Sequence, residues 1–231
     1  MHLLWAPEVN LRSNLFVEHG VSADAHGVQC RSITPRSDLE STWAVHTEQA
    51  LLESSWCWPQ HQGIVIARSG RLAQTENSAP WQMWSNAGHE AFAQAIARAL
   101  GQRQPDQQLC VLPDANDVIS DLPSALGVVT SAQEGLSVAL APAQILTNSM
   151  LGSLEDHLLR VFEVMARRCN LIYLTDLRRE GEDLVACPLG QGLLPRRLIL
   201  DLLEAWRPPA CPVVIMAENV SDQFDWLELT I

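Results

Sequence analysis

The sequence contains no lysine, and all 15 of its basic residues are arginines. A Schiff-base aldolase, a pyridoxal phosphate enzyme and a P-loop nucleotide site each require a lysine amine, so this absence excludes all three classes. Basic residues are also outnumbered by 27 acidic ones, which gives a net charge of −12 and a pI of about 4.9. Nucleic acid and anionic membranes should repel such a chain, and we expect neither as a partner.

Long apolar runs are absent as well. No stretch approaches the roughly 20 apolar residues that a membrane-spanning helix requires. The N-terminal MHLLWAPEVNL has too short an apolar run, and no basic flank, for a secretory signal. We therefore expect a cytoplasmic protein.

Motifs for metal binding and for hydrolysis are missing too. The six cysteines form no Cys-x-x-Cys pair, and several lie in apolar runs, which favours buried reduced thiols. The histidines are scattered without metal-ligand spacing on one face. No Gly-x-Ser-x-Gly elbow supports a Ser-His-Asp hydrolase.

What the sequence does contain is typical of one globular domain. Its 231 residues are 47% hydrophobic and 18% charged, with no internal repeat and no low-complexity segment. A chain of this length forms one sizeable core, so we expect a single domain over residues 1–231.

From residue 63 onward, short β-branched and apolar runs alternate with amphipathic helices. The predicted strands are residues 63–67, 109–112, 136–141, 171–175 and 212–217, and the predicted helices are residues 89–100, 153–168 and 193–206. This alternation predicts an α/β fold with a parallel sheet. In such folds functional groups gather just past the carboxyl ends of the strands. The residues at those positions are Arg68, Pro113, Asp114, Ala141, Gln144, Asp176 and Glu218.

The first 62 residues are less regular. Residues 3–6 and 26–33 are interpreted as strands, and residues 14–20 as a strand or the end of a helix. The pattern over residues 42–56, TWAVHTEQALLESSW, predicts a helix.

Three motifs of the second half occur in a specific order. Tyr173-Leu-Thr-Asp176 ends a strand, Pro188-Leu-Gly190-Gln-Gly192 precedes a helix, and Glu218 ends the next strand. This order resembles the xylose isomerase-like TIM barrels, which include sugar phosphate isomerases and epimerases and DNA repair enzymes of the endonuclease IV type. Members commonly have a strand ending in His-x-x-Asp, then Pro-x-Gly-x-Gly, a helix, and a strand ending in glutamate.

The resemblance covers about residues 63–218 and implies an α/β TIM barrel of the xylose isomerase-like type. A full barrel typically takes about 250 residues, and the chain before residue 63 has little room for three complete βα units. We therefore expect residues 1–62 to form shortened or irregular N-terminal βα units and residues 63–219 to form the recognisable later units.

The same resemblance implies a degenerate metal site. Family chemistry uses a divalent metal held by carboxylates and imidazoles at the strand ends. At the matching positions this sequence has Pro113, Ala141, Gln144 and Tyr173, and only Glu218 persists among the expected ligands. One such ligand cannot hold a divalent ion tightly, so we expect no cofactor.

The candidate catalytic residues carried over from the family pattern are Glu218 and Asp176. Glu218 is either a retained ligand or base, or a carboxylate on the barrel rim. Arg178 and Arg179 either grip a phosphate or carboxylate, or pair with nearby acidic residues. The candidate ligand-binding residues are Arg178, Arg179, Asp114, Gln144 and Tyr173.

Two further features have alternative interpretations. Asp114, Asp117 and Asp121 are either a displaced acidic site or carboxylates at a helix N-terminus. Gly190-Gln-Gly192 is a weak signal for anion binding, and tight-turn geometry explains it equally.

The function that these observations favour is that of a divergent protein of the sugar phosphate isomerase and epimerase type. It would lack the metal site and bind a small polar ligand, such as a sugar or sugar phosphate, or a partner at the carboxyl-end rim. One alternative is an active isomerase or epimerase with an acidic site rebuilt from Glu218, Asp176 and Asp114. The other is a non-catalytic structural subunit in a homo-oligomer or with a protein partner, joined through the tryptophans of residues 56–58 and 81–84.

Overall fold

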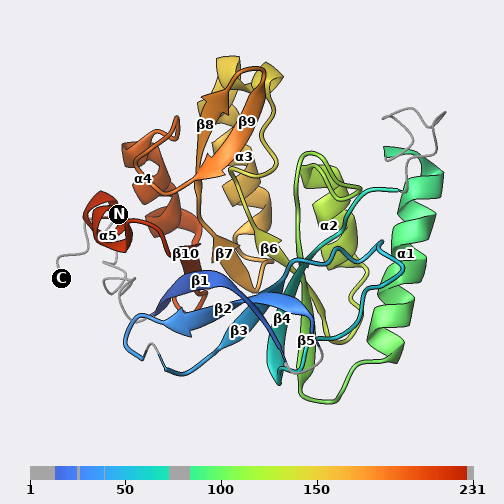
Figure 1. The fold of residues 1–231 in the computed structure, drawn as a ribbon. Coiled ribbons are helices and arrows are strands. Elements are labelled where there is room, and N and C mark those ends of the chain that lie inside the picture. The colour runs from blue at the N-terminus through green and yellow to red at the C-terminus, as the bar shows by residue number, and fades with distance from the viewer. Residues whose placement is uncertain (1–13, 25–26, 39, 73–83, 228–231) are drawn as a thin grey trace, which may run out of the picture.

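The computed structural model describes residues 14–24, 27–38, 40–72 and 84–227. Eight strands close into a barrel in the order β1-β10-β7-β6-β5-β4-β3-β2, and helices flank the wall formed by β4 to β10 (Figure 1). This is the α/β barrel predicted from the sequence. The barrel strands are β1 (Leu15–Ala23), β2 (Gln29–Pro35), β3 (Ala44–Thr47), β4 (Gly63–Arg68), β5 (Gln107–Leu112), β6 (Leu136–Leu140), β7 (Leu171–Tyr173) and β10 (Val213–Met216).

The helices of the second half cover the outer face of the barrel. Each buries one stripe, as α1 does with residues at helical spacing such as Phe92, Ile96 and Ala99. The predicted helices and strands after residue 63 are confirmed. The helical segments are α1 (Asn86–Gly101), α2 (Leu122–Thr130), the 3-10 helix η3 (Asn148–Ser153), α3 (Leu154–Met165), α4 (Arg196–Trp206) and α5 (Val220–Trp226).

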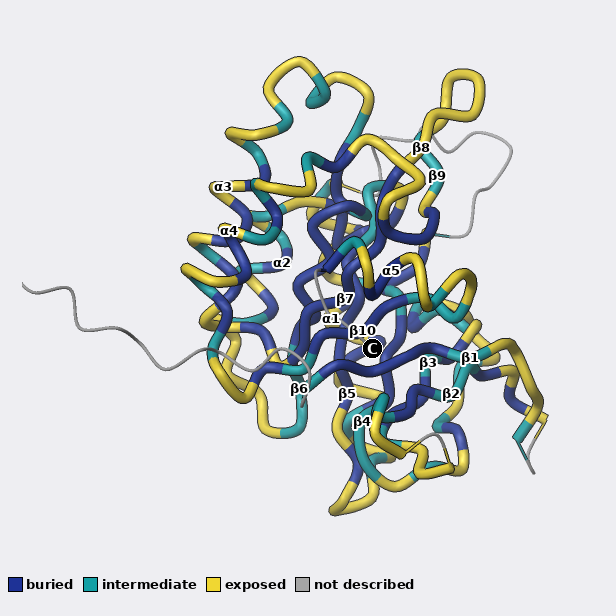
Figure 2. The backbone as a smooth tube through the Cα atoms, turned by 90° about the vertical axis from the view of Figure 1, so that its left-hand side faces the viewer, coloured by how far each residue is buried: buried dark blue, intermediate teal, exposed yellow. Residues whose placement is uncertain are grey.

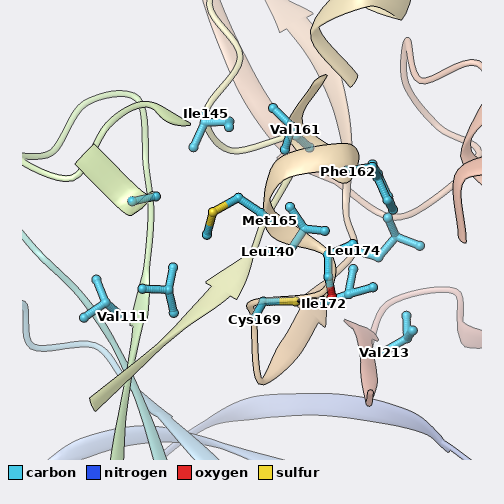
Figure 3. Packing of buried hydrophobic residues seen from close by; sticks show 14 of the residues in the cluster. Val111, Leu140, Ile145, Val161, Phe162, Met165, Cys169, Ile172, Leu174 and Val213 are labelled. Carbon is cyan, nitrogen blue, oxygen red and sulfur yellow. Dashed lines mark hydrogen bonds between the residues drawn. The ribbon is translucent and has the colours of Figure 1, made fainter. Parts of the chain in front are cut away.

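The hydrophobic core has two parts, one inside and one outside the barrel wall. Alternate residues of the strands point inward, where Phe16, Ile33 and Ile66 belong to one cluster. Most outward residues, among them Val111 and Ile172, belong to a larger cluster that includes residues of the helices, whereas outward residues of β2, β3 and β4 form a separate small cluster. Figure 3 shows the residues of α3 in this outer layer, and Figure 2 shows the buried strands beneath the half-exposed helices.

The N-terminal third is irregular, as predicted, because β2 runs opposite to the other seven strands. It pairs antiparallel with β1 and with β3, whereas β1 and β10 close the barrel in parallel. Among the described residues no helix separates β1, β2 and β3. Three strands therefore need far fewer residues than three βα units.

The predicted strand at residues 26–33 is confirmed as β2, and residues 14–20 lie mostly in β1. The helix predicted over residues 42–56 is wrong. Ala44–Thr47 form β3, and turns follow. Strand β3 pairs on both of its edges, with β2 and with β4. This long-range pairing overrides the local helical pattern. The strand predicted at residues 3–6 lies outside the described residues.

A two-stranded hairpin extends beyond the barrel after β7 (Figure 1). It consists of β8 (Asp176–Glu180) and β9 (Asp183–Cys187), and Gly181 at its tight end has a positive φ of 63°. Five of the six cysteines are buried, and Cys57 is exposed. None of the described helices has the length and apolar character required to cross a bilayer.

Candidate functional site

A cavity of about 250 Å³ lies at the carboxyl ends of the parallel barrel strands. Because β2 is reversed, its first residues reach the same rim as the last residues of its neighbours. The ionisable residues lining the cavity are Arg31, His46, Glu48, Arg68, Asp114 and Tyr173. A larger cavity of about 460 Å³ lies between α1 and α2. Parallel barrels place their functional groups at the strand ends, so we assign the candidate site to the smaller cavity.

Glu18 of β1 is the buried centre of the polar groups at the floor of this cavity. Only 2% of its side chain is exposed. Its Oε1 accepts a hydrogen bond from Nδ1 of His46 at 2.7 Å, and its Oε2 accepts one from the hydroxyl of Tyr173. Arg31 places Nη1 at 3.6 Å from the same Oε2. Four strands, β1, β2, β3 and β7, therefore each contribute one of these groups.

The carboxylate of Glu18 is ionised in this setting. Burial by itself would raise the pKa of Glu18. The hydrogen bond from His46, the positive charge of the His46 ring when it is protonated, the hydrogen bond from Tyr173 and the charge of Arg31 together outweigh burial and lower that pKa. Burial, followed by the charge of Glu18, raises the pKa of Tyr173 well above its usual value. Tyr173 is therefore a neutral phenol that donates its proton to an ionised carboxylate.

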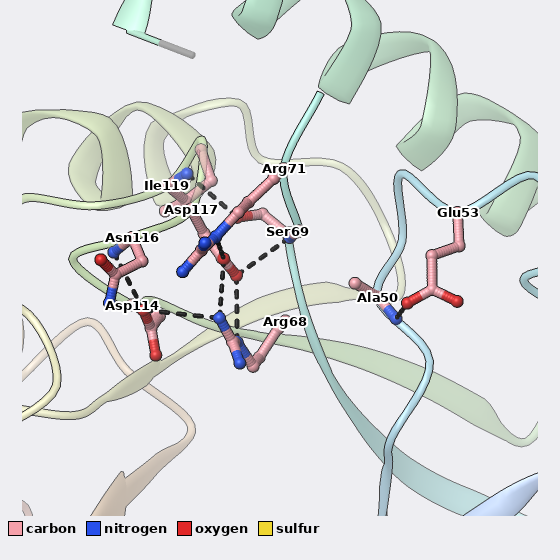
Figure 4. Close-up of polar contacts among 10 residues, drawn as sticks. Ala50, Glu53, Arg68, Ser69, Arg71, Asp114, Asn116, Asp117 and Ile119 are labelled. Atoms are coloured by element: carbon pink, nitrogen blue, oxygen red, sulfur yellow. Dashed lines mark hydrogen bonds and ion pairs between the residues drawn. The ribbon is translucent and has the colours of Figure 1, made fainter. Parts of the chain in front are cut away.

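Arg68, at the end of β4, forms the second polar group of the rim (Figure 4). Its Nη2 and Nε donate to the two oxygens of Asp117 at 2.7 and 3.1 Å, and Nη2 lies 3.5 Å from Asp114. Asp117 is buried and also accepts from the backbone N–H of Gly70 at 3.0 Å. Burial would lower the pKa of Arg68, but the contacts with Asp117 outweigh it and raise that pKa. The guanidinium thus stays charged and fixed.

Three of the predicted site residues line the cavity: Asp114, Gln144 and Tyr173. Asp114 and Gln144 belong to the loops that follow β5 and β6. Tyr173 ends β7 and points into the barrel, where it belongs to the interior cluster. The structure thus brings together residues that are 29 or more positions apart in the sequence.

The other four predicted residues, Asp176, Glu218, Arg178 and Arg179, are not among the lining residues. Asp176 is buried and accepts four backbone N–H groups, two on each carboxylate oxygen. Glu218 is exposed after β10. Arg178 is exposed on the hairpin and pairs with Glu180 at 2.6 Å, and Arg179 is exposed beside it.

The remaining sequence features have structural placements, except Trp81, which lies outside the described residues. Asp121 caps α2 through a capping box with Ser124, which confirms the helix-cap interpretation for that residue. Trp56 and Trp58 form an edge-to-face pair with centroids 5.4 Å apart, and Trp58 donates to a backbone carbonyl of α1. Trp84 is 55% exposed.

Glu18, Arg31 and His46 are the site residues that sequence reasoning missed. Each lies on one of the first three barrel strands, where the family pattern assigns nothing. A signal existed in β1, because Glu18 interrupts an apolar run in LFVEHG. His46 could not be placed while its segment was interpreted as a helix.

The residues at the rim do not fit the divalent metal that the resemblance to xylose isomerase-like barrels implies. No group of three or more His, Cys, Asp or Glu side chains is arranged to hold a metal within the described ranges. The buried carboxylate at the cavity floor is already held by an imidazole, a phenol and a guanidinium. A guanidinium beside the carboxylate would also repel a divalent cation.

Comparison with known proteins gives similarity in fold only. No protein-family model matches the sequence, and no curated protein matches it either. Among solved structures, the chain is similar to the IolI protein with a bound zinc atom, at 11% identity and a TM-score of 0.45, over 72% of this chain and 56% of that one.

Two further similar structures have lower TM-scores. One is a xylose isomerase-like TIM barrel protein from Mycobacterium smegmatis in complex with magnesium, at 11% identity and a TM-score of 0.41, over 72% of this chain and 60% of that one. The other is mannonate dehydratase from Streptococcus suis serotype 2, at 9% identity and a TM-score of 0.41, over 65% of this chain and 54% of that one. This chain thus spans between half and two thirds of each of these proteins. The expected barrel type is represented among them, while the α/β barrel itself is established by the strand topology.

Proposed function

We propose that this chain is a divergent protein of the sugar phosphate isomerase and epimerase type, one that lacks the metal site and binds a small polar ligand in the rim cavity. The main support for the proposal is the environment of the Thr175 hydroxyl. This hydroxyl lines the cavity, its residue is 1% exposed, and it has no hydrogen-bond partner among the described residues. A buried hydroxyl without a partner is unfavourable, and a hydroxyl of a ligand would supply one.

The size of the cavity supports a ligand of about one sugar unit. Pockets for drug-sized molecules measure roughly 300–1,000 Å³, and this cavity measures about 250 Å³. Its position at the carboxyl ends of the strands is where barrels of this class bind small molecules.

The charges around the cavity favour a neutral polyhydroxylated ligand over a phosphate. Arg31 is paired with Glu48 at 2.6 Å and approaches Glu18, and Arg68 is paired with Asp117 and Asp114. Each positive charge is therefore already matched by two carboxylates. A phosphate would meet more negative than positive charge, whereas sugar hydroxyls both donate to carboxylates and accept from guanidinium groups.

Ligand-detected NMR with D-xylose, D-fructose and fructose 6-phosphate, in the presence of EDTA, tests this proposal. We expect the neutral sugars to bind without metal and more tightly than the phosphate. Asp114→Asn should weaken binding about tenfold, because a ligand hydroxyl loses a charged acceptor. Asp201→Asn is the matched control, because Asp201 is also a partly exposed, arginine-paired aspartate but lies on α4. Binding that requires a divalent metal, or no binding of any sugar, would contradict the proposal.

The active-isomerase alternative receives less support from the placement of its residues. Of Glu218, Asp176 and Asp114, only Asp114 lines the cavity, and both oxygens of Asp176 are occupied by backbone N–H groups. The structural-subunit alternative rests on Trp84, the most exposed of the described large hydrophobic residues at 55%. Size-exclusion chromatography with light scattering tests it, and a clean monomer would count against it.

A further inference from the structure

The pairing of His46 with Glu18 has a geometry that ligand binding alone does not require. The two residues come from β3 and β1, which are neighbours of β2 on its two sides. His46 is largely buried, with 12% of its side chain exposed, yet it lines the cavity. Its ring packs edge-on against Tyr173, with centroids 5.9 Å apart and an interplanar angle of 76°. The imidazole is therefore held from two directions.

The ionised carboxylate decides where the proton of the neutral imidazole lies. An ionised carboxylate only accepts hydrogen bonds, so Nδ1 of His46 must donate to Glu18 across the 2.7 Å contact. The other ring nitrogen, Nε2, then carries the lone pair. Among the described residues Nε2 forms no hydrogen bond. The carboxylate itself is not free to react, because its second oxygen accepts from Tyr173.

From this arrangement we infer that His46 is a general base and acid that acts, through Nε2, on the ligand in the rim cavity without a metal ion. Glu18 is the positioning residue that fixes its tautomer, and Tyr173 in turn holds Glu18. The inference rests on the proposed function, because it assumes that the cavity holds a small hydroxylated molecule.

The substrate class that suits this site is a small hydroxy ketone, whose carbon next to the carbonyl carries an acidic hydrogen. The lone pair of Nε2 takes that proton, so an N–H bond forms as the C–H bond breaks. The electron pair moves onto the carbonyl oxygen of the ligand as an enolate, and the Thr175 hydroxyl, which lines the same cavity and has no partner among the described residues, can donate a hydrogen bond to that oxygen. The protonated imidazole then returns a proton to carbon, and no external oxidant or reductant is consumed.

Exchange of carbon-bound hydrogen with D₂O tests the inference directly. Dihydroxyacetone, D-xylulose and D-fructose are incubated with the protein and EDTA, and 1H NMR follows the loss of the C–H signals beside the carbonyl. We expect at least one compound to exchange faster than in buffer. His46→Gln should reduce that rate at least about 100-fold, the usual contribution of general acid–base catalysis. His89→Gln is the matched control, because His89 is exposed on α1 and should leave the rate unchanged.

The role of Glu18 has a separate readout. In 15N NMR the neutral imidazole of His46 should carry its proton on Nδ1 in the wild type. Glu18→Gln should mix the two tautomers and lower the exchange rate about tenfold or more, whereas Tyr173→Phe should retain the Nδ1 tautomer. A variant that merely loosened the fold would not change which nitrogen is protonated.

The possible outcomes separate the two proposals. If the compounds bind but exchange only at the buffer rate, the acid–base role is wrong and the binding function stands. If exchange survives His46→Gln, another group is the base and the inference is again wrong. If the sugars of the binding test bind but none of these three ketones does, the inference alone is wrong. If neither set of compounds binds, the proposed function fails and the inference falls with it.

Discussion

At the scale of single residues, the site is built around one buried carboxylate. Glu18 accepts hydrogen bonds from His46 and Tyr173 and lies beside the charge of Arg31, and these three residues belong to three different strands. Its charge is therefore compensated inside the barrel. Such an arrangement is stabilising only while the carboxylate is ionised, because the neutral acid cannot attract Arg31.

The first prediction concerns the pH dependence of stability. The folded pKa of Glu18 is lowered from 4.5, so the unfolded chain binds the proton more readily than the folded chain. Its stabilising contribution is therefore present above about pH 4.5 and is lost as pH falls through the folded value. Urea unfolding between about pH 3 and 6 should show a steeper loss of stability on acidification for the wild type than for Glu18→Gln. The exposed Glu204→Gln should behave like the wild type, and equal slopes for all three would contradict the prediction.

The second prediction concerns the buried partner of Arg68. Asp117 is 1% exposed and accepts hydrogen bonds from Arg68 and from a backbone N–H. Asp117→Asn removes the hydrogen-bonded one of the two carboxylates beside Arg68, although Asp114 remains at 3.5 Å and water can reach Arg68, which is 41% exposed. We expect a loss of about 1–3 kcal/mol in unfolding free energy by urea titration. The solvent-exposed pair of Arg197 with Asp201 provides the comparison, and Asp201→Asn should cost less than about 0.5 kcal/mol.

Sequence reasoning reached only part of this residue-level site. Arg68, Asp114 and Gln144 were identified because a strand followed by a loop marks the rim. Tyr173 was identified through the family pattern. Glu18 and His46 were not, because which face of a strand points inward depends on its pairing partners. The partners of β1 are β2 and β10, and β10 is about two hundred residues away in the chain. The partners of β3 are β2 and β4.

At the scale of elements, the loop between β9 and α4 is organised by Asp176. The carboxylate accepts hydrogen bonds from the backbone N–H groups of Gly190, Gly192 and Leu194. The glycine-rich segment therefore wraps around the Asp176 side chain and binds it in place of an external anion. This explains the Gly-x-Gly spacing by tight approach of the backbone. Gly192 has no room for a side chain, since an added Cβ would lie 2.2 Å from the carbonyl oxygen of Leu177.

The third prediction follows from that crowding. Gly192→Ala should lower the unfolding free energy by about 1–3 kcal/mol, because the obstructing atom belongs to the backbone and cannot move aside cheaply. Gly127→Ala is the matched substitution, because Gly127 lies within α2 and a Cβ there meets nothing within 4 Å. It should be neutral or stabilising by up to about 1 kcal/mol. Thermal and urea unfolding of both variants measure the difference, and similar effects of the two substitutions would refute the argument.

The barrel strands and the longer helices after residue 63 could be predicted because each of those helices has its own periodic apolar stripe and each of those strands is a continuous apolar run. The hairpin strands β8 and β9 and the short helix α5 were not predicted. The segment around β3 could not be predicted either. Its strand has only four residues, and the polar turns that follow it contain enough leucine and alanine to imitate a helix. Strand formation there depends on β2 and β4 being present, which no local pattern reports.

At the scale of the whole molecule, a short antiparallel unit completes the barrel. The three strands β1 to β3 bridge the edges of β10 and β4, and they contribute Phe16, Ile33 and Ala44 to the interior. The same unit supplies Glu18, Arg31 and His46 to the site. The segment from β1 to β3 therefore both closes the barrel and forms part of the cavity.

The fourth prediction is that this segment cannot be removed. Deletion of residues 1–62 would leave β4 and β10 as open edges and expose the apolar interior, and both changes promote aggregation. We expect loss of soluble protein on expression. The comparison is a deletion outside the barrel, in which Asn-Gly replaces residues 179–184 at the tip of the hairpin. That variant should remain soluble with a cooperative thermal transition. A folded and soluble fragment of residues 63–231 would show instead that the later strands form a core of their own, and the site would then have to be sought without β1 and β3.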